Sequence, residues 1–125
     1  MQIRVYYEDT DAGGIVYHSR YINFCERARS EHFFAQGVMP GDGEKSGFVV
    51  RNITAEFLAT AKLSDMLEVK TAIKTLKNSS VVLRQEVFRE NTCLFGMDVV
   101  LVYVEEGKPR RIPEHFKTLF EGFSA

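Results

Sequence analysis

The sequence predicts an α+β fold in which a curved antiparallel sheet of about five strands wraps around one long helix. One amphipathic helical pattern lies near the start of the chain, from Arg20 to Gln36. Four strand-like runs then follow in succession, and short gaps between them favour antiparallel hairpins. The chain has 125 residues, enough for one proper core, so we expect a single domain over residues 1–125.

The chain begins with an expected short strand that leads into a turn rich in Asp and Gly. Ile3, Val5 and Tyr7 alternate with more polar neighbours, which is the period of a strand with one buried face. The turn that follows, Asp9 to Gly14, ends this strand, and a helix signal begins near Tyr17 or His18.

The long helix is expected to bury one face, because apolar residues recur along it three and four positions apart. Gly37 comes directly after Gln36 and is typical of the residue that follows a helix end. Val38 to Gly47 is rich in Gly, Pro and charged residues, so we expect a loop there. The expected buried residues of the helix are Tyr21, Phe24, Cys25, Ala28, His32 and Phe33.

The second half of the chain supplies most of the sheet. The expected strands are Phe48 to Leu58, Met66 to Leu76, Ser80 to Arg89, and Cys93 to Val104. The last run is almost entirely apolar, so we expect it inside the sheet, and Pro113 opens a short C-terminal helix through Phe120. A single helix lying on one curved sheet is the hot-dog arrangement. Because the helix covers only one sheet face, we expect dimers or larger assemblies to cover the other.

Composition excludes several classes of function. With 26% charged residues and a net charge of -1, the chain has no electrostatic footprint for nucleic acid. The N-terminus lacks a secretory signal pattern, and no apolar run approaches the roughly 20 residues that span a bilayer, so we expect a cytoplasmic protein. Cys25 and Cys93 lie far apart in apolar patterns, which favours buried free thiols over a disulfide or a metal site.

The turn before the helix has the residue types that acyl transfer needs. Gly13 and Gly14 allow the backbone to approach a ligand, and the helix start offers unpaired N–H groups at the positive end of its dipole. Asp11 adds a carboxylate. A base and donors aimed at a carbonyl oxygen would together promote attack on an acyl group.

Each of these residues also has a purely structural interpretation. Asp9 is more readily a turn cap, because Asp side chains bond nearby backbone, and for Asp11 the two roles are evenly balanced on this basis. A calcium loop is rejected, because its later ligand positions fall on Gly13 and Arg20. A phosphatase nucleophile is set aside because the chain is too short for a doubly wound domain.

The stretch from Tyr6 to Arg29, YYEDTDAGGIVYHSRYINFCERAR, resembles a known family. It is similar to the hot-dog acyl-CoA thioesterases of the 4-hydroxybenzoyl-CoA thioesterase type, and most of all to their Tol-Pal-associated, YbgC-like branch. The pattern Asp-x-Asp-x-x-Gly-x-Val-Tyr-His carries the resemblance, and Ser79-Ser80 and Arg84 to Val87 extend it. Length and element order match over nearly the whole chain.

The resemblance implies an acyl-CoA thioesterase with three catalytic residues. Asp11 is the implied catalytic carboxylate, and Tyr7 positions substrate or water. His18 lies at the helix start, where the backbone N–H polarises the thioester carbonyl. The implied substrate-binding residues are Gly14, Tyr17, Lys77, Ser79 and Ser80, with Lys77 as a candidate contact for the phosphates of coenzyme A. Spacing alone makes core packing the more common use of Tyr17. Ala12 stands where the benzoyl-CoA relatives have a proline.

The resemblance further implies no metal and no cofactor, because coenzyme A is part of the substrate. The implied partners are acyl-CoA, acyl carrier protein and further copies of the chain in a dimer or tetramer. The resemblance also implies that this protein has a role in lipid metabolism and lies peripherally at the inner membrane. Asp11 would act either as the nucleophile or as the base that activates water. Two alternatives remain open: a hot-dog hydratase acting on enoyl thioesters, and a non-catalytic module that binds an acyl carrier.

Overall fold

The computed structural model describes residues 1–43 and 45–123 of the chain. The elements in chain order are strand β1 (Gln2–Arg4), the short 3-10 helix η1 (Tyr7–Asp9), helix α1 (His18–Ala35), strands β2 (Ser46–Phe57), β3 (Met66–Leu76), β4 (Ser80–Arg89), β5 (Thr92–Glu105) and β6 (Lys108–Pro109), and helix α2 (Glu114–Glu121).

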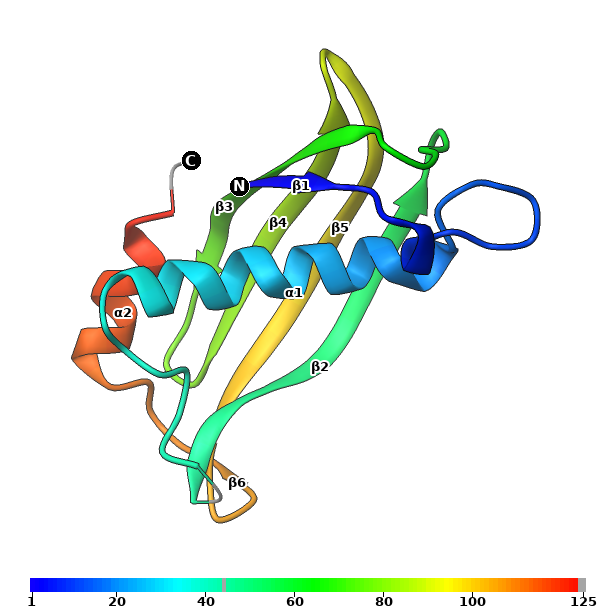
Figure 1. Cartoon of the computed structure of the whole chain (residues 1–125). Helices are drawn as coiled ribbons and strands as arrows, with labels where there is room; N and C mark the ends of the chain where they lie inside the picture. Colours follow the sequence, from blue (N-terminus) through cyan, green and yellow to red (C-terminus); the bar gives the residue numbers. More distant parts are fainter. Residues whose placement is uncertain (44, 124–125) are drawn as a thin grey trace.

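The strands form one curved antiparallel sheet, and α1 crosses its concave face (Figure 1). The strand order is β1-β3-β4-β5-β2, and the two-residue strand β6 pairs with β5. The predicted hot-dog arrangement is therefore confirmed. As expected, the apolar strand β5 lies inside the sheet, between β4 and β2.

The ends of α1 follow from local chemistry. The helix begins at His18, and it ends where Gly37 adopts a φ of +71°, a left-handed conformation that glycine adopts without steric cost. The N–H of Gly37 donates to the carbonyl of Phe34, and the N–H of Val38 donates to the carbonyl of Phe33. This pair of bonds is a Schellman motif, which confirms the role predicted for Gly37.

The core lies between α1 and the concave face of the sheet. Phe24 and Cys25 of α1 are completely buried, as are Leu83 of β4 and Val99 of β5. Burial raises the pKa of the Cys25 thiol to about 12, so this side chain stays a packed, unreactive thiol at neutral pH. Both cysteines are free, as predicted, although Cys93 is only half-buried.

The first strand is shorter than predicted. It ends at Arg4, and the chain then turns into η1, because the Asp9 carboxylate accepts a hydrogen bond from the backbone N–H of Tyr6 at 2.8 Å. The expected alternation of Tyr7 with Ile3 and Val5 is therefore wrong. Ile3 and Val5 are buried, but the Tyr7 side chain is 83% exposed.

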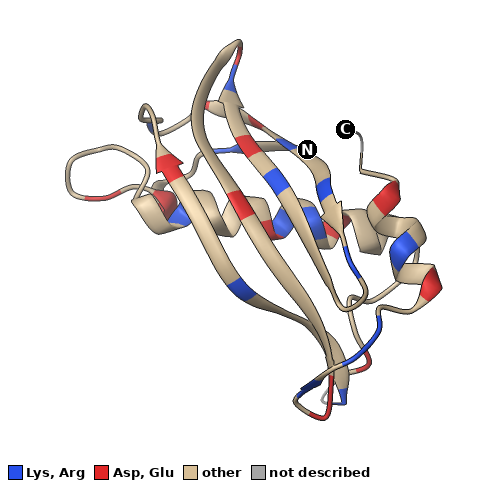
Figure 2. Cartoon of the chain, turned by 180° about the vertical axis from the view of Figure 1, so that it is seen from behind, with Lys and Arg blue, Asp and Glu red and all other residues tan. Residues whose placement is uncertain are grey.

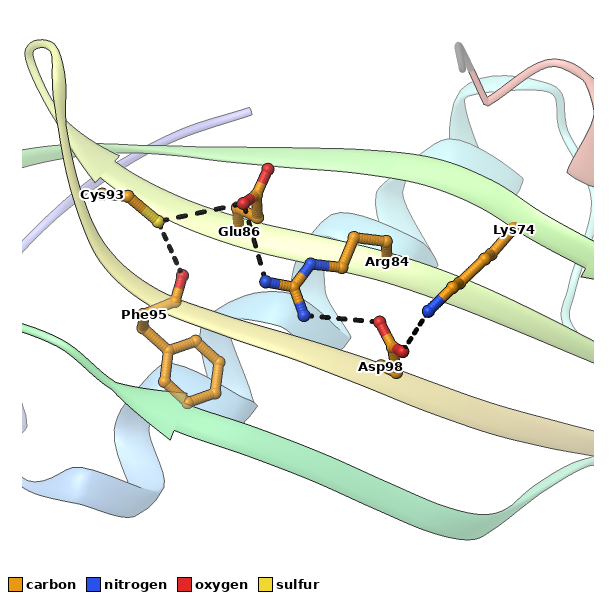
Figure 3. Close-up of polar contacts among 6 residues, drawn as sticks. All are labelled: Lys74, Arg84, Glu86, Cys93, Phe95 and Asp98. Atoms are coloured by element: carbon orange, nitrogen blue, oxygen red, sulfur yellow. Dashed lines mark hydrogen bonds and ion pairs between the residues drawn. The ribbon is translucent and has the colours of Figure 1, made fainter.

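Seen from behind, the strands of the sheet carry both basic and acidic residues along their length (Figure 2). Figure 3 shows a network in which Asp98 binds Lys74 at 2.6 Å and Arg84 at 3.4 Å, while Arg84 also lies 3.7 Å from Glu86. The hydrogen bond from Lys74 is the largest influence that lowers the pKa of Asp98. Gly96 leaves the space that the Arg84 guanidinium fills. The convex face of the sheet is therefore much more polar than expected for a face that a partner chain covers (Figure 3).

Among the described residues, no helix is long and apolar enough to cross a membrane.

Candidate active site

The Asp11 turn projects beyond the N-terminal end of α1 as a loop between η1 and the helix (Figure 1). Its base is closed by a bridge between Thr10 and Val16 and by the hydrogen bond from the N–H of Asp11 to the carbonyl of Ile15. Gly14 adopts a φ of +81°, which an L side chain rarely adopts. Gly14 therefore lets the loop reverse within a few residues.

The two carboxylates of the turn have different surroundings. Asp9 is 3% exposed and serves the fold: its Oδ2 accepts from Tyr6, its Oδ1 lies 3.7 Å from the Arg20 guanidinium, and its carbonyl accepts the N–H of Tyr17. The structure thus bears out the capping interpretation of Asp9.

Asp11, in contrast, is exposed. Its Oδ1 accepts the N–H of Gly13 at 2.8 Å, and its Oδ2 has no hydrogen-bond partner among the described residues. One oxygen therefore fixes the side chain in the turn, while the other is available to a water molecule or a substrate.

An open pocket of about 470 Å³ surrounds the Asp11 turn. It contains three of the predicted site residues, Asp11, Tyr7 and Gly14. Tyr7 lines the pocket, and its hydroxyl makes no hydrogen bond among the described residues. Thr10, Ala12 and Leu63 complete the lining.

The start of α1 has free donors. Tyr17 is the N-cap but makes no side-chain capping bond, and the first turn contains no acidic residue. The N–H of Tyr17 donates a hydrogen bond to the carbonyl of Asp9, and the N–H of Arg20 donates one to the carbonyl of Tyr17. The backbone N–H groups of His18 and Ser19 have no hydrogen-bond acceptor in residues 1–43 or 45–123. Two unpaired backbone donors therefore lie at the positive end of the helix dipole.

The ring of His18 lies outside the lining of this pocket. It packs against Tyr17, with ring centroids 4.5 Å apart, and meets the edge of Phe57 at 6.1 Å. Tyr17 is half exposed rather than part of the core. Within one chain the structure thus brings Asp11, Tyr7 and Gly14 together, and it places Tyr17 and His18 on the β2 side of the helix start.

The hairpin predicted to hold coenzyme A lies at the other end of the sheet. Lys77, Ser79 and Ser80 follow the last residue of β3, whereas the first residue of β3 lies near the Asp11 turn. The 11 residues of β3 span about 35 Å at ~3.3 Å per residue. A single chain therefore does not bring this hairpin to Asp11.

The loop of residues 58–65 supports the turn, a role that the sequence did not indicate. The carbonyl of Ala61 accepts the N–H of Val16, and Ile15 forms a bridge with Lys62. The loop is in turn held by Tyr21, whose hydroxyl accepts the N–H of Ala61 at 3.1 Å. Burial raises the pKa of Tyr21, so the hydroxyl stays protonated. No short motif marks this loop, because its role depends on contacts between distant segments.

Arg89 and Asp65 hold the same loop from the sheet side. Arg89 Nη1 donates to Asp65 Oδ2 and to the carbonyl of Thr60, both at 3.0 Å. Burial alone would raise the pKa of Asp65, but hydrogen bonds from the Lys62 backbone and from Arg89 hold it below its ordinary value.

No group of three or more His, Cys, Asp or Glu side chains among the described residues is arranged to hold a metal ion.

Comparison with known proteins identifies the family. Residues 13–94 match the thioesterase superfamily, a stretch that includes Gly14, His18, all of α1 and the sheet from β2 to the start of β5. The chain belongs to the thioesterase superfamily. This confirms the predicted resemblance and the predicted class of enzyme, a thioester hydrolase.

Relatives with assigned names agree with this assignment. The acyl-CoA thioesterase YbgC of Helicobacter pylori is 45% identical over an alignment 130 positions long, which covers 95% of this chain and 97% of the relative. The acyl-CoA thioester hydrolase YbgC of Escherichia coli is 44% identical over an alignment 127 positions long, which covers 95% of this chain and 92% of the relative.

Solved structures show the same fold. A probable thioesterase from Bartonella henselae superimposes with a TM-score of 0.83 at 38% identity, covering 90% of this chain and 97% of that one. A protein of Aquifex aeolicus gives a TM-score of 0.89 at 25% identity, covering 96% of this chain and 97% of that one.

Proposed function

We propose that this thioesterase hydrolyses acyl-CoA at the Asp11 turn, releasing a carboxylic acid and the free thiol of coenzyme A. The observation that carries the proposal is the pairing of an exposed carboxylate with the uncapped start of α1. Asp11 keeps one oxygen free, and the amides of His18 and Ser19 are unpaired at the same end of the helix. The names of the YbgC relatives support acyl-CoA as the substrate.

Hydrolysis at this turn proceeds in two steps. Asp11 takes a proton from a water molecule as the water oxygen bonds to the thioester carbon, and the carbonyl oxygen becomes an oxyanion. The intermediate then collapses, the carbon–sulfur bond breaks, and the thiolate leaves and is protonated by solvent, while Asp11 returns its proton to solvent and is ionised again. Alternatively, the Asp11 carboxylate attacks the carbon itself, and water later hydrolyses the anhydride. Both routes require an ionised Asp11.

The free amides of α1 are proposed to stabilise the oxyanion in either route. Removing one such donor typically raises the barrier by about 3 kcal/mol. His18 contributes its backbone N–H in this scheme, and its ring, packed on Tyr17, shapes the adjacent surface. Tyr7, which lines the pocket, is proposed to position substrate or water through its hydroxyl.

The rest of the predicted binding set is proposed to act in an assembly of several chains. Lys77, Ser79 and Ser80 lie at the far end of the sheet, so a second copy would have to bring them to Asp11. β2 offers a long edge for such a copy, because among the described residues it pairs with one strand, β5, apart from the single bridge between Gly41 and Gly47, and Val49 and Val50 are about half exposed. Acyl carrier protein is an alternative carrier of the acyl group.

A thiol-release assay tests the proposal. The purified protein is mixed with saturated and 2-enoyl CoA esters, and free thiol is measured together with the absorbance of the enoyl group. We expect thiol release from both kinds of ester. Loss of the enoyl signal without thiol would instead show a hydratase, and binding of acyl-CoA or acyl carrier protein without turnover would show a non-catalytic module.

A further inference from the structure

The hydroxyl of Tyr21 joins the first turns of α1 to the loop of residues 58–65. Tyr21 lies three residues after His18, the first of the two proposed oxyanion donors, which places it about 4.5 Å further along the helix axis. Its side chain is buried, and its hydroxyl accepts the N–H of Ala61 at 3.1 Å. A buried amide is costly to leave unpaired, so this bond holds the loop against the helix.

Other aromatic rings fix the ring that carries this hydroxyl. It stacks on Phe95 of β5, with centroids 5.3 Å apart and planes 12° apart, and it meets Phe24 and Phe57 edge-on, both at 6.2 Å. Phe24 and Phe95 are completely buried. The core therefore determines where the hydroxyl lies, and the loop takes its position from the hydroxyl.

Ala61 connects the Tyr21 hydroxyl to the base of the Asp11 turn. Its carbonyl accepts the N–H of Val16 at 2.9 Å, and Val16 forms a bridge with Thr10, the residue before Asp11. Ala61 is itself buried. One residue of the loop is therefore bonded through its N–H to the helix and through its carbonyl to the turn.

The same loop also holds the chain where it enters η1. The N–H of Val5 donates to the carbonyl of Asp65, and the N–H of Ser64 donates to the carbonyl of Val5, both at 2.9 Å. The segment from Val5 to Val16, which includes the turn, is thus bonded to the loop at both ends. A shift of the loop would move the whole segment.

This segment is joined to α1 on two sides. On the η1 side, the carbonyl of Asp9 accepts the N–H of Tyr17 at 2.9 Å. On the Val16 side, the connection to the helix runs through Ala61 and the Tyr21 hydroxyl. Contacts on the η1 side alone would leave the turn able to swing about them, whereas contacts on both sides fix its orientation relative to the helix.

We propose that Tyr21 is a positioning residue for the reaction, because its hydroxyl sets the separation between the Asp11 carboxylate and the unpaired amides at the start of α1. This inference rests on the function proposed above. Tyr21 lies outside the lining of the pocket around Asp11, so it acts through Ala61 and the turn. A misplacement of reacting groups by about 1 Å can lower a rate by about 10²-fold.

The test is Tyr21→Phe, which keeps the stacked ring and removes the hydroxyl. We expect kcat for thiol release to fall by about 10- to 100-fold and KM to change by less than about threefold, because carboxylate and amides act together on the transition state. The control is Tyr103→Phe, which removes a hydroxyl that makes no hydrogen bond among the described residues from another buried tyrosine. Its kcat should stay within about twofold of wild type. Rates are compared at a temperature where circular dichroism shows each variant fully folded.

Hydrogen exchange in ¹⁵N-labelled protein without substrate provides a second readout. In Tyr21→Phe we expect the N–H of Val16 to exchange at least about tenfold faster than in wild type, because the loop that accepts it is no longer held to the helix. In Tyr103→Phe the exchange of Val16 should stay unchanged.

Two results would overturn the positioning role while an active wild type leaves the proposed function standing. One is a wild-type kcat in Tyr21→Phe, and the other is a raised KM at constant kcat, which would assign Tyr21 to substrate binding. If wild type itself releases no thiol, the proposed function fails. Unchanged exchange at Val16 would then separately overturn the link from the hydroxyl to the turn, and faster exchange would support it.

Discussion

The contact between Arg89 and Asp65 offers a direct test of how the scaffold holds the site. Replacing Arg89 with Gln removes two hydrogen bonds of 3.0 Å, one to a carboxylate that is 13% exposed and one to the carbonyl of Thr60. Hydrogen bonds to charged groups contribute roughly 1.5–3 kcal/mol. Arg89 itself is about one-third exposed, so solvent screening lowers the sum, and we expect a loss of about 2 kcal/mol in the free energy of unfolding.

That loss should depend on pH in a definite direction. The pKa of Asp65 in the folded chain lies below its ordinary value of 3.8, so the ion pair stabilises the fold fully above that value. The stabilisation then disappears as the pH falls through the lower, folded-state pKa. The difference between wild type and Arg89→Gln should therefore be largest near neutral pH and shrink below pH 3.8.

Thermal unfolding by circular dichroism measures this difference. At neutral pH, 2 kcal/mol corresponds to a melting temperature lower by about 8 °C for a chain of this size. The control is Arg111→Gln, which breaks an exposed pair with Glu114 and should change the melting temperature by less than about 3 °C. An Arg89→Gln variant that melts with wild type, or a gap that is equal at neutral and acid pH, would refute the reasoning.

Three further substitutions probe the turn, the helix start and the core. Gly14→Ala meets no neighbouring atom but forces an L side chain to a φ of +81°, so calorimetry should show a loss of about 1–2 kcal/mol; an unchanged midpoint would contradict the strain. His18→Ala keeps the backbone amide, so the rate of thiol release should fall only in part, by about tenfold or less, and complete loss would instead assign the chemistry to the imidazole. Phe33→Ala empties a buried position among Phe48, Phe116 and Phe120 and should lower the unfolding free energy, measured in urea, by about 3–5 kcal/mol; a loss below 1 kcal/mol would mean that the cluster is loosely packed.

Periodicity and turn chemistry account for the parts of the fold that could be predicted. The spacing along α1, Gly37 at its end, Pro113 before α2 and the apolar run of β5 each depend on residues close together in sequence. The predicted first strand is too long, because its alternating pattern continues to Tyr7. In the structure the Asp9 carboxylate accepts the N–H of Tyr6, and the chain turns into η1 there instead of continuing the strand.

The site was predicted only where it is local. Asp11, Gly14 and the helix start are neighbours in the chain, so the sequence alone indicated them. The support from Arg89 and Asp65 joins segments 24 residues apart, and the hydrogen bond between Tyr21 and Ala61 joins residues 40 apart. Nothing in a short motif encodes such contacts. For the same reason, Lys77 and its hairpin were grouped with Asp11 although β3 separates them.

The measurement that tests the central claim most directly is the rate of thiol release by Asp11→Asn. Asparagine keeps an oxygen that accepts the N–H of Gly13, so the turn should persist and the melting temperature should stay unchanged. Loss of the charge should lower kcat by about 10²- to 10⁴-fold, whereas Glu8→Gln, an equal change at an exposed position in the adjacent η1, should leave kcat near that of wild type. Full activity in Asp11→Asn would contradict the account.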